Sequence, residues 1–201
     1  LALSFVALTT WAQQPQLTWL GIPQNGNSSA AVDISADGRI AVGHFFTGST
    51  YLPFVWTRER GFEVPFYSPA RRELFAQAIS QDGLTVVGFS HEPGIAGDSV
   101  VWTVVRSPQR LNHPTDAYAS DTNQNGSIVV GFGSADGGYR PLLWSGGGNS
   151  TNLGSLGGRF AYPHGISADG SIVVGRSLDS SNKWRAFRWT QQTGMQNLGA
   201  S

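Results

Sequence analysis

The chain has 201 residues, of which 40% are hydrophobic and 13% are charged, and its formal net charge at pH 7 is +0. This length suffices for a globular domain with a buried core. The balanced charges leave no basic block that could neutralise a run of phosphates, so we expect no nucleic-acid partner. The absence of cysteine excludes disulfides, thiolate metal sites and cysteine nucleophiles.

An apolar stretch opens the chain. Residues 1–8 (LALSFVAL) have the length of the hydrophobic region of a signal peptide, and the small residues Thr10 and Ala12 suit cleavage before Gln13. A buried strand or a short helix is the alternative. We therefore expect residues 1–12 to be the remnant of a signal peptide and the protein to be secreted. No other stretch approaches the ~20 apolar residues of a membrane span.

Residues 13–201 form one repeat domain, because a single pattern recurs four times. Each copy has an Asp-Gly or Asn-Gly pair, a valine-rich run that ends in glycine, and a tryptophan 13 or 14 residues after that glycine. The final glycines are Gly43, Gly88, Gly131 and Gly175, and the tryptophans are Trp56, Trp102, Trp144 and Trp189. The repeats span about residues 22–67, 68–113, 114–157 and 158–201.

Four short strands, a to d, are expected in each repeat. Strand a ends at an Ile-Ser pair, and the pair that follows predicts a type I′ hairpin turn with positive φ at both central residues. Strand b is the valine run, strand c ends on the tryptophan, and strand d is clearest at residues 151–154 and 195–199. The expected turn residues are Asp37, Asp82, Asn125 and Asp169. A repeated calcium site is the alternative, but Asn125 replaces a carboxylate without disturbing the series.

Strand b indicates the architecture. Pairs such as Val129-Val130 and Val173-Val174 are apolar without alternation, which is typical of strands buried on both faces. Four-stranded units of this length that stack face to face make a β-propeller, so we expect an all-β fold of antiparallel blades. A string of separate sandwiches would leave each repeat too small to bury a core. One tryptophan per repeat at a fixed register is expected to form the structural core, at about 1.5–3 kcal/mol each.

The N-terminal segment bears on how many blades to expect. Residues 17–21 match strand d, with Leu20-Gly21 aligned to Leu153-Gly154 and Leu198-Gly199. The fourth repeat already has its own strand d, so this segment has no vacancy to fill. We therefore expect further repeats after Ser201 and a chain that is part of a larger ring.

The repeat resembles a known family. Ile-Ser-Ala-Asp-Gly-x-x-Val-Val-Gly at 166–175, Arg-Ala-Phe-Arg-Trp-Thr at 185–190 and Gly-Met-x-x-Leu-Gly at 194–199 are similar to the bacterial extracellular HAF repeat. The likeness covers residues 18–201 and implies a propeller-like protein outside the cell or at a bacterial cell surface. The His-Ala-Phe triplet of that family is replaced by Leu52-Pro53-Phe54, Asp98-Ser99-Val100, Arg140-Pro141-Leu142 and Arg185-Ala186-Phe187. No copy has the histidine, so no role of that side chain carries over.

No complete catalytic constellation is visible. Glutamates are scarce. The densest polar group lies on a single b–c loop and consists of His91, Glu92 and Asp98. A loop that carries several polar residues is usually just exposed to solvent. The four histidines lack the spacing of metal ligands. We therefore expect no catalytic residue, no metal and no cofactor. The alternative is a secreted glycan hydrolase or lyase that uses carboxylates on loops of one face.

The b–c loops vary in length and content, whereas the a–b turns are uniform. Three of these loops end in an aromatic residue, and two of those are followed by arginine. Aromatic rings near arginine suit sugar faces and acidic groups, and the alternative, which the residues favour more, is that these rings shield the blade edges. The predicted contacts are Tyr51, Tyr139, Arg140, Trp184 and Arg185. The expected function is a non-catalytic binding or surface-display module for a glycan or a protein.

Overall fold

The computed structural model describes residues 18–65, 73–92, 95–103, 106–113, 115–146 and 149–199. Every regular element in these ranges is a β-strand. None of them therefore contains a helix that could cross a membrane. The expected signal-peptide remnant, residues 1–12, lies outside the described residues.

The strands form four consecutive blades. Blade 1 contains β1 (Ser28–Ile34), β2 (Ile40–Phe46), β3 (Tyr51–Thr57) and β4 (Gly61–Glu63). Blade 2 contains β5 (Glu73–Ile79), β6 (Thr85–Glu92), β7 (Ile95–Thr103) and β8 (Arg106–Arg110). Blade 3 contains β9 (Ala117–Thr122), β10 (Ile128–Ala135), β11 (Gly138–Ser145) and β12 (Thr151–Asn152). Blade 4 contains β13 (Gly157–Ile166), β14 (Val173–Asp179), β15 (Trp184–Thr190) and β16 (Gly194–Asn197).

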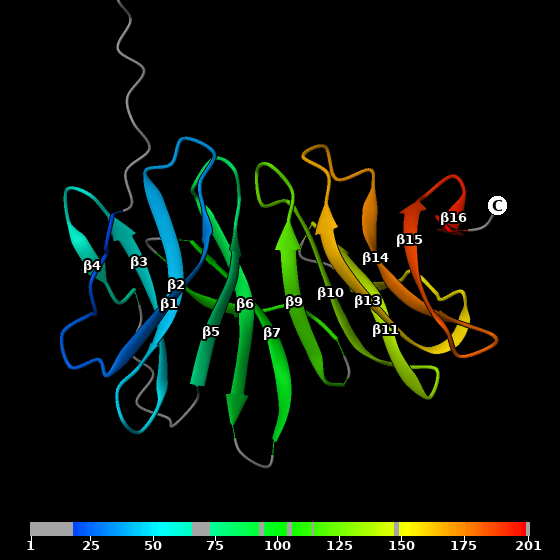
Figure 1. Cartoon of the computed structure of the whole chain (residues 1–201), viewed down its shortest axis with the longest axis horizontal. Helices are drawn as coiled ribbons and strands as arrows, with labels where there is room; N and C mark the ends of the chain where they lie inside the picture. The colour runs from blue at the N-terminus through cyan, green and yellow to red at the C-terminus, as the bar shows by residue number, and fades with distance from the viewer. Residues whose placement is uncertain are drawn as a thin grey trace, which may run out of the picture.

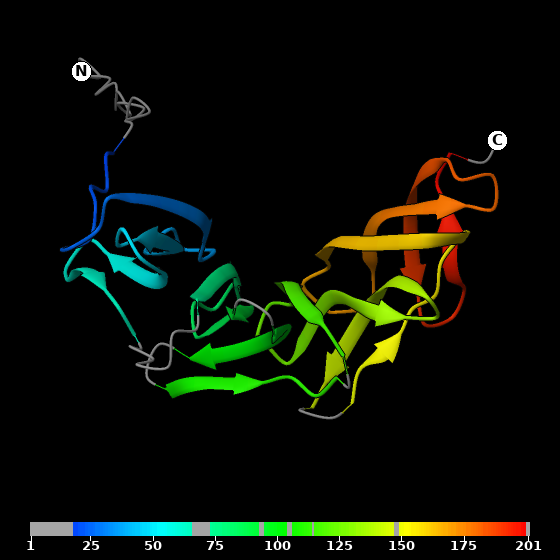
Figure 2. The ribbon, with the colours of Figure 1, turned by 90° about the horizontal axis from the view of Figure 1, so that it is seen from below.

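Consecutive strands within each blade pair antiparallel, and the blades follow one another along an arc (Figures 1 and 2). The first strands, β1, β5, β9 and β13, contact one another in turn and form the inner side of the arc. One parallel contact, between Tyr139 of β11 and Phe160 of β13, joins blades 3 and 4 into an eight-stranded sheet. No strand pairing joins blade 1 to blade 4 in the described part of the chain, so the sheets do not close into a ring.

The core consists of three apolar junctions between neighbouring blades. We call the side of a blade that faces the next blade its forward side and the opposite side its rear side. Neighbouring valines of strand b point to opposite sides, so that Val86 packs toward blade 1 and Val87 packs toward blade 3. Both are fully buried, as the unbroken valine run predicted. The junctions stack the sheets face to face, which is the packing of a β-propeller.

The glycine that ends each valine run is required by the close approach of strand a. A Cβ atom on Gly88 would collide with the carbonyl oxygen of Phe75, and one on Gly131 with that of Tyr118. A bulge lies beside each contact, between Ala76 and Ala78 in blade 2 and opposite Gly131 in blade 3. The repeated glycine therefore marks the place where the bulged inner strand presses on strand b.

The a–b turns differ from the predicted type I′ geometry. In the a–b turn of blade 2, Gly83 has a positive φ of 75°, whereas the turn residue Asp82 does not have a positive φ. Its Oδ1 accepts hydrogen bonds from Ser80 Oγ at 2.6 Å and from Leu84 N at 3.0 Å. This local capping holds the aspartate in ordinary backbone geometry and leaves the left-handed position to glycine. Asp37, Asn125 and Asp169 accept equivalent bonds from the backbone two residues later.

Backbone hydrogen bonds also join successive turns. Ala36 N donates to Gln81 O at 3.1 Å, Asp82 N to Gln124 O at 3.1 Å, and Gln124 N to Ala168 O at 3.0 Å. The uniform turns therefore form a continuous ladder along one end of the four blades. The opposite end, which carries the b–c loops, is free to vary.

Candidate functional site

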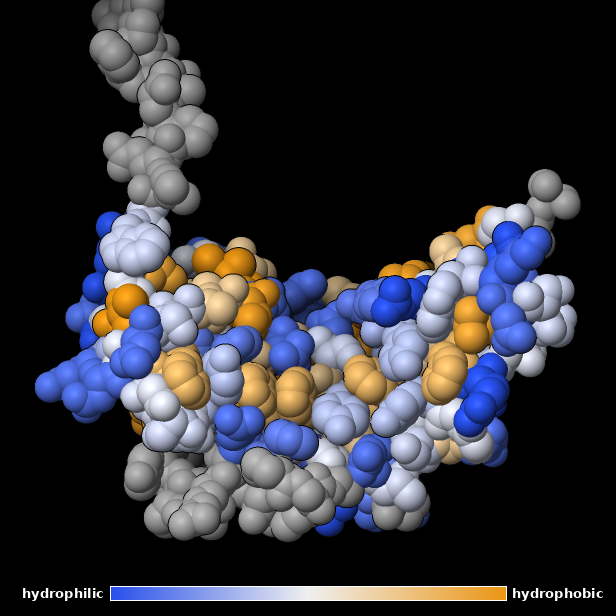
Figure 3. Space-filling view, turned by 60° about the horizontal axis from the view of Figure 1, so that its bottom comes forward, coloured by the Kyte–Doolittle hydropathy of each residue, from blue (hydrophilic) through white to orange (hydrophobic). Residues whose placement is uncertain are grey.

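Aromatic rings cross all four blades without a break on the side of the b–c loops. We call this set the ring belt. Its members are Tyr51, Phe75, Phe89, Tyr118, Phe132, Tyr139, Tyr162 and Trp184. Every member keeps part of its side chain accessible. Figure 3, which brings this side forward, shows pale and light-orange residues across the middle of the surface.

The belt follows from the strand register. Phe75 pairs with Phe89 within blade 2, and Tyr118 pairs with Phe132 within blade 3. These rings stack at centroid distances of 4.9 and 5.2 Å. Phe89 then meets Tyr118 edge to face at 5.2 Å, which carries the contact from one blade to the next. In blades 2 and 3 the residue after the final glycine of strand b and its partner on strand a thus place a ring pair on the belt.

The structure brings two of the predicted aromatic contacts near each other. Tyr139 and Trp184 both contact the ring of Tyr162, at 6.1 and 5.9 Å. Tyr51 lies at the other end of the belt, against Phe75 at 5.0 Å. Trp184 is the most accessible of the set, with 47% of its surface exposed. The blade 4 end of the belt is therefore the part that offers a flat ring to a ligand.

Arg140 is held within the protein. Its side chain is buried, and its Nη1 donates to the carbonyl oxygens of Tyr139 and Arg159. Its Nε lies 3.8 Å from Asp136 Oδ2. Arg185 is also engaged within the protein, because its Nε donates to Asp179 Oδ2 at 2.8 Å. Both predicted arginines therefore brace the ends of b–c loops.

A different arginine stands over the rings. The guanidinium carbon of Arg176 lies 4.8 Å from the centroid of Trp184 and 5.5 Å from that of Tyr162. Arg176 occupies the position after the final glycine of strand b, where blades 2 and 3 carry Phe89 and Phe132. Aligning strand b across the repeats is enough to find this arginine in the sequence, whereas the composition of the b–c loops does not point to it. The result is a positive charge beside an exposed indole.

The predicted core tryptophans fall into two classes. Trp102 and Trp144 are 2% and 1% exposed and lie in the first and second junctions. Trp144 Nε1 also donates to Asn112 O at 2.9 Å. Trp56 and Trp189 are only partly buried, and Trp56 packs within blade 1 against an aromatic cluster.

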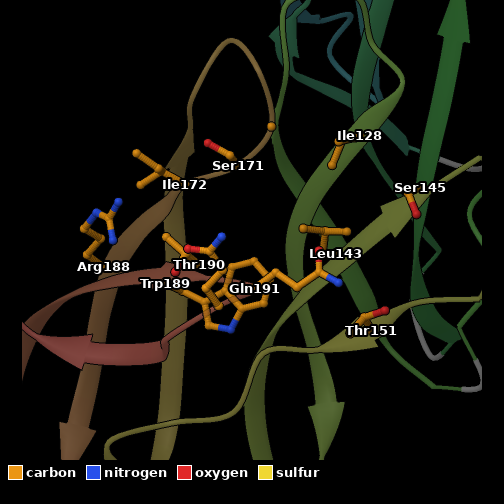
Figure 4. Close-up of a pocket in the computed structure, with 12 residues that line it drawn as sticks. Ile128, Leu143, Ser145, Thr151, Ser171, Ile172, Arg188, Trp189, Thr190 and Gln191 are labelled. Carbon is orange, nitrogen blue, oxygen red and sulfur yellow. The ribbon is translucent and has the colours of Figure 1, made fainter.

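Trp189 lines a pocket between blades 3 and 4, at the end of the blades opposite the belt. The pocket has a volume of about 620 Å³. Figure 4 shows the Trp189 ring and the Gln191 side chain on the side of Leu143, whereas Arg188 is directed away. Thr151 and Ser171 add hydroxyl groups to the lining. The sequence favoured core packing over ligand stacking for Trp189 and did not reveal this pocket.

Two aspartates of the inner strands have structural partners. Asp33 Oδ2 accepts the backbone N–H of Ile79 at 2.8 Å, and Asp121 Oδ2 accepts that of Ile166 at 2.9 Å. Each bond links a blade to the one after it. Burial raises the pKa of Asp121 above its ordinary value, and the nearby charge of Asp33 adds to this effect.

The predicted polar loop contributes an ion pair within the protein. Asp98 of the predicted polar loop forms an ion pair with Arg110 at 2.8 Å. Among the described residues, no three histidine, aspartate or glutamate side chains are grouped so that they could hold a metal ion.

Solved structures with a similar fold include TolB from Acinetobacter baumannii, with a TM-score of 0.67 and 16% identity over 85% of this chain and 43% of that protein. A putative TolB from Agrobacterium tumefaciens matches with a TM-score of 0.64 and 15% identity over 87% of this chain and 62% of that one. A puromycin-hydrolyzing peptidase from Mycobacterium tuberculosis matches with a TM-score of 0.62 and 16% identity, over 86% of this chain and 29% of that protein.

These matches show a β-propeller fold, and at such identities they show the fold alone. The chain spans less than two thirds of the length of each of these proteins. No family model and no curated protein matches the sequence.

Proposed function

We propose that this protein is an exported, non-catalytic binding module that recognises glycans through the blade 4 end of the ring belt. The observation that carries the proposal is the group of Trp184, Tyr162 and Arg176, in which an exposed indole, a phenol and a guanidinium share one surface. Flat aromatic faces stack on the C–H faces of sugar rings, and a guanidinium pairs with carboxylate or sulfate groups. Export is proposed from the apolar residues 1–8.

A binding role is favoured over hydrolysis or lyase activity by the use of the inner carboxylates. Asp33 and Asp121 accept backbone N–H groups of neighbouring blades, as structural carboxylates do. A glycosidase needs two carboxyl groups free to act as acid and as base or nucleophile in one cleft. Asp33 and Asp121 instead fasten blades together.

The test is a glycan array that contains neutral and acidic oligosaccharides, probed with the wild type and with Trp184→Ala. We expect the substitution to weaken binding about tenfold, since an aromatic stacking contact contributes on the order of 0.5–1.5 kcal/mol. Arg176→Gln should reduce binding of the acidic members selectively. Trp19→Ala is the matched control, because Trp19 is 84% exposed and lies outside the belt. Binding that is unchanged by Trp184→Ala, or that falls equally in Trp19→Ala, would remove the proposal.

A further inference from the structure

A hollow lies beside the ring belt, where the b–c turn of blade 3 meets the first strand of blade 4. It has a volume of about 410 Å³, and it is lined by residues 134–139, Arg159 and Phe160. Its two sides come from adjacent blades, so both are formed by residues that the structure describes. Tyr139 is also a member of the belt, which makes the hollow a lateral extension of that surface.

The turn that forms one side of the hollow has a fixed backbone. Asp136 and Gly137 connect β10 to β11 as a two-residue loop, since Ala135 pairs with Gly138. Their φ angles are 51° and 71°, the pair of positive values that a type I′ hairpin turn requires. Arg159 on the opposite side holds this turn, because its Nε and Nη2 donate to Gly137 O at 3.1 and 2.9 Å. A ligand would therefore meet groups that are already in position, which lowers the entropic cost of binding.

Two charged side chains of the hollow keep hydrogen-bonding atoms available. Asp136 Oδ2 accepts a hydrogen bond from Asn152 Nδ2 at 2.9 Å and lies 3.8 Å from Arg140 Nε. Asp136 Oδ1 and Arg159 Nη1 form no hydrogen bond with any described residue. Both side chains are exposed. The hollow thus offers a ligand one acceptor and one donor of opposite charge.

Two aromatic rings complete the lining. Tyr139 and Phe160 lie 6.3 Å apart with an angle of 31° between their planes, and both are partly accessible. The guanidinium carbon of Arg159 lies 5.6 Å from the centroid of Phe160. This combination suits a sugar residue, whose C–H faces pack on rings and whose neighbouring hydroxyls donate to a carboxylate and accept from a guanidinium. The charges of Asp136 and Arg159 offset each other, so an uncharged sugar is favoured over an acidic one.

A row of rings connects the hollow to the blade 4 end of the belt. Tyr139 contacts Tyr162 at 6.1 Å, and Tyr162 contacts Trp184, over which Arg176 lies. One end of the row therefore carries a guanidinium, whereas the other end carries a guanidinium together with a carboxylate.

We propose that the hollow is a second subsite for the ligand of the belt, and that this ligand is an acidic polysaccharide in which neutral and charged sugars alternate. A neutral sugar occupies the hollow, and an acidic sugar of the same chain lies at Arg176. The inference rests on the proposed glycan binding and adds to it the class of glycan and the need for a chain that spans both subsites.

The proposal is tested by calorimetric titration of the protein with disaccharides and tetrasaccharides of three kinds. Hyaluronan fragments alternate neutral and acidic sugars, oligogalacturonates are acidic at every residue, and cello-oligosaccharides are neutral. We expect the hyaluronan tetrasaccharide to bind most tightly of all. It should bind about tenfold more tightly than the hyaluronan disaccharide, because the longer chain adds hydrogen bonds to the charged groups of the hollow.

Two substitutions in the hollow locate this gain. Asp136→Asn removes the charge of the acceptor and keeps the turn, since Asn-Gly also favours type I′ geometry. Arg159→Gln removes the guanidinium. Each should weaken binding of the hyaluronan tetrasaccharide about tenfold and leave the disaccharide unchanged. The matched controls are Asp37→Asn and Arg39→Gln, which alter an exposed ion pair on an a–b turn at the opposite end of the blades. Circular dichroism establishes that all variants keep the β fold.

Trp184→Ala separates this inference from the proposed function. If it weakens glycan binding while the two hyaluronan lengths bind equally, the second subsite is overturned and the proposed function stands. The second subsite is overturned as well if hyaluronan does not bind, if either other tetrasaccharide binds as tightly, or if the hollow variants match their controls. If Trp184→Ala leaves all binding unchanged, the proposed function fails and the inference fails with it.

Discussion

At the scale of single residues, Trp144 shows how packing and a hydrogen bond combine at a blade junction. Its ring is buried, and its N–H is satisfied by Asn112 O. We expect Trp144→Ala to lower the free energy of unfolding by about 3–5 kcal/mol, because it leaves a cavity and an unpaired carbonyl. Urea unfolding measures the change. Trp19→Ala should cost less than ~0.5 kcal/mol, since that ring is exposed. A cost below ~1 kcal/mol for Trp144→Ala would contradict its place in the core.

Asp121 gives the fold a pH dependence with a defined sign. Its raised pKa means that the folded chain binds the proton more tightly than the unfolded chain, whose value is near 3.8. Protonation therefore stabilises the fold, and this contribution is lost as the pH rises through the folded pKa. We expect wild-type stability to improve relative to Asp121→Asn as the pH falls from roughly 7 to 4. Urea midpoints of both proteins across this range provide the measurement, and a difference that is constant or of opposite sign would refute the assignment.

The arginines show what residue-level reasoning from sequence could not reach. Arg140 and Arg185 follow aromatic residues at the same register and appear equivalent in the sequence. Arg140 is buried because the contact of Tyr139 with Phe160 brings the carbonyl of Arg159 onto its guanidinium. That contact joins residues far apart in the chain and depends on how two blades meet. The local sequence around Arg140 therefore cannot predict its burial. The position of Arg176, by contrast, could have been found by aligning strand b across the repeats.

At the scale of elements, the turn glycines provide a matched pair. Gly38 and Gly126 occupy equivalent turns with φ of 71° and 72°. A Cβ atom on Gly38 would meet nothing within 4 Å, whereas one on Gly126 would collide with Thr85 of the preceding blade. We expect Gly38→Ala to cost about 1–2 kcal/mol from the left-handed backbone alone. Gly126→Ala should cost about 1–3 kcal/mol more from overpacking, as measured by chemical denaturation. Equal costs would show that the turns do not interlock.

The strands themselves followed from the sequence because each carries a strong local signal. Valine runs and the glycine after them located strand b, and the tryptophans located the end of strand c. The predicted turn type was wrong because the side chain of Asp82 accepts a hydrogen bond from the backbone N–H of Leu84. The presence of an Asp-Gly pair in the sequence does not reveal this interaction. Strand β12, the strand d of blade 3, is only two residues long.

At the scale of the whole molecule, the repeat explains both the fold and its open ends. The residue at one register of strand b is buried by the following blade in blades 1 to 3, as Val130 is, whereas Val174 of blade 4 is 42% exposed at the end of the described residues. The ring belt likewise crosses the blades as a continuous surface because every blade contributes to it. In a repeat protein each blade contacts mainly its nearest neighbours. The burial of strand b and the continuity of the ring belt therefore both result from the stacking of blades.

The central claim is that ligands bind at the blade 4 end of the belt, and the indole N–H signals of the seven tryptophans test it most directly. A two-dimensional ¹H–¹⁵N spectrum should be recorded while the glycan with the strongest array signal is added. The account predicts that the signal of Trp184 moves and that those of Trp102, Trp144 and Trp189 stay in place. A shift of Trp189 without Trp184 would instead put the ligand in the pocket at the opposite end of the blades and contradict the account.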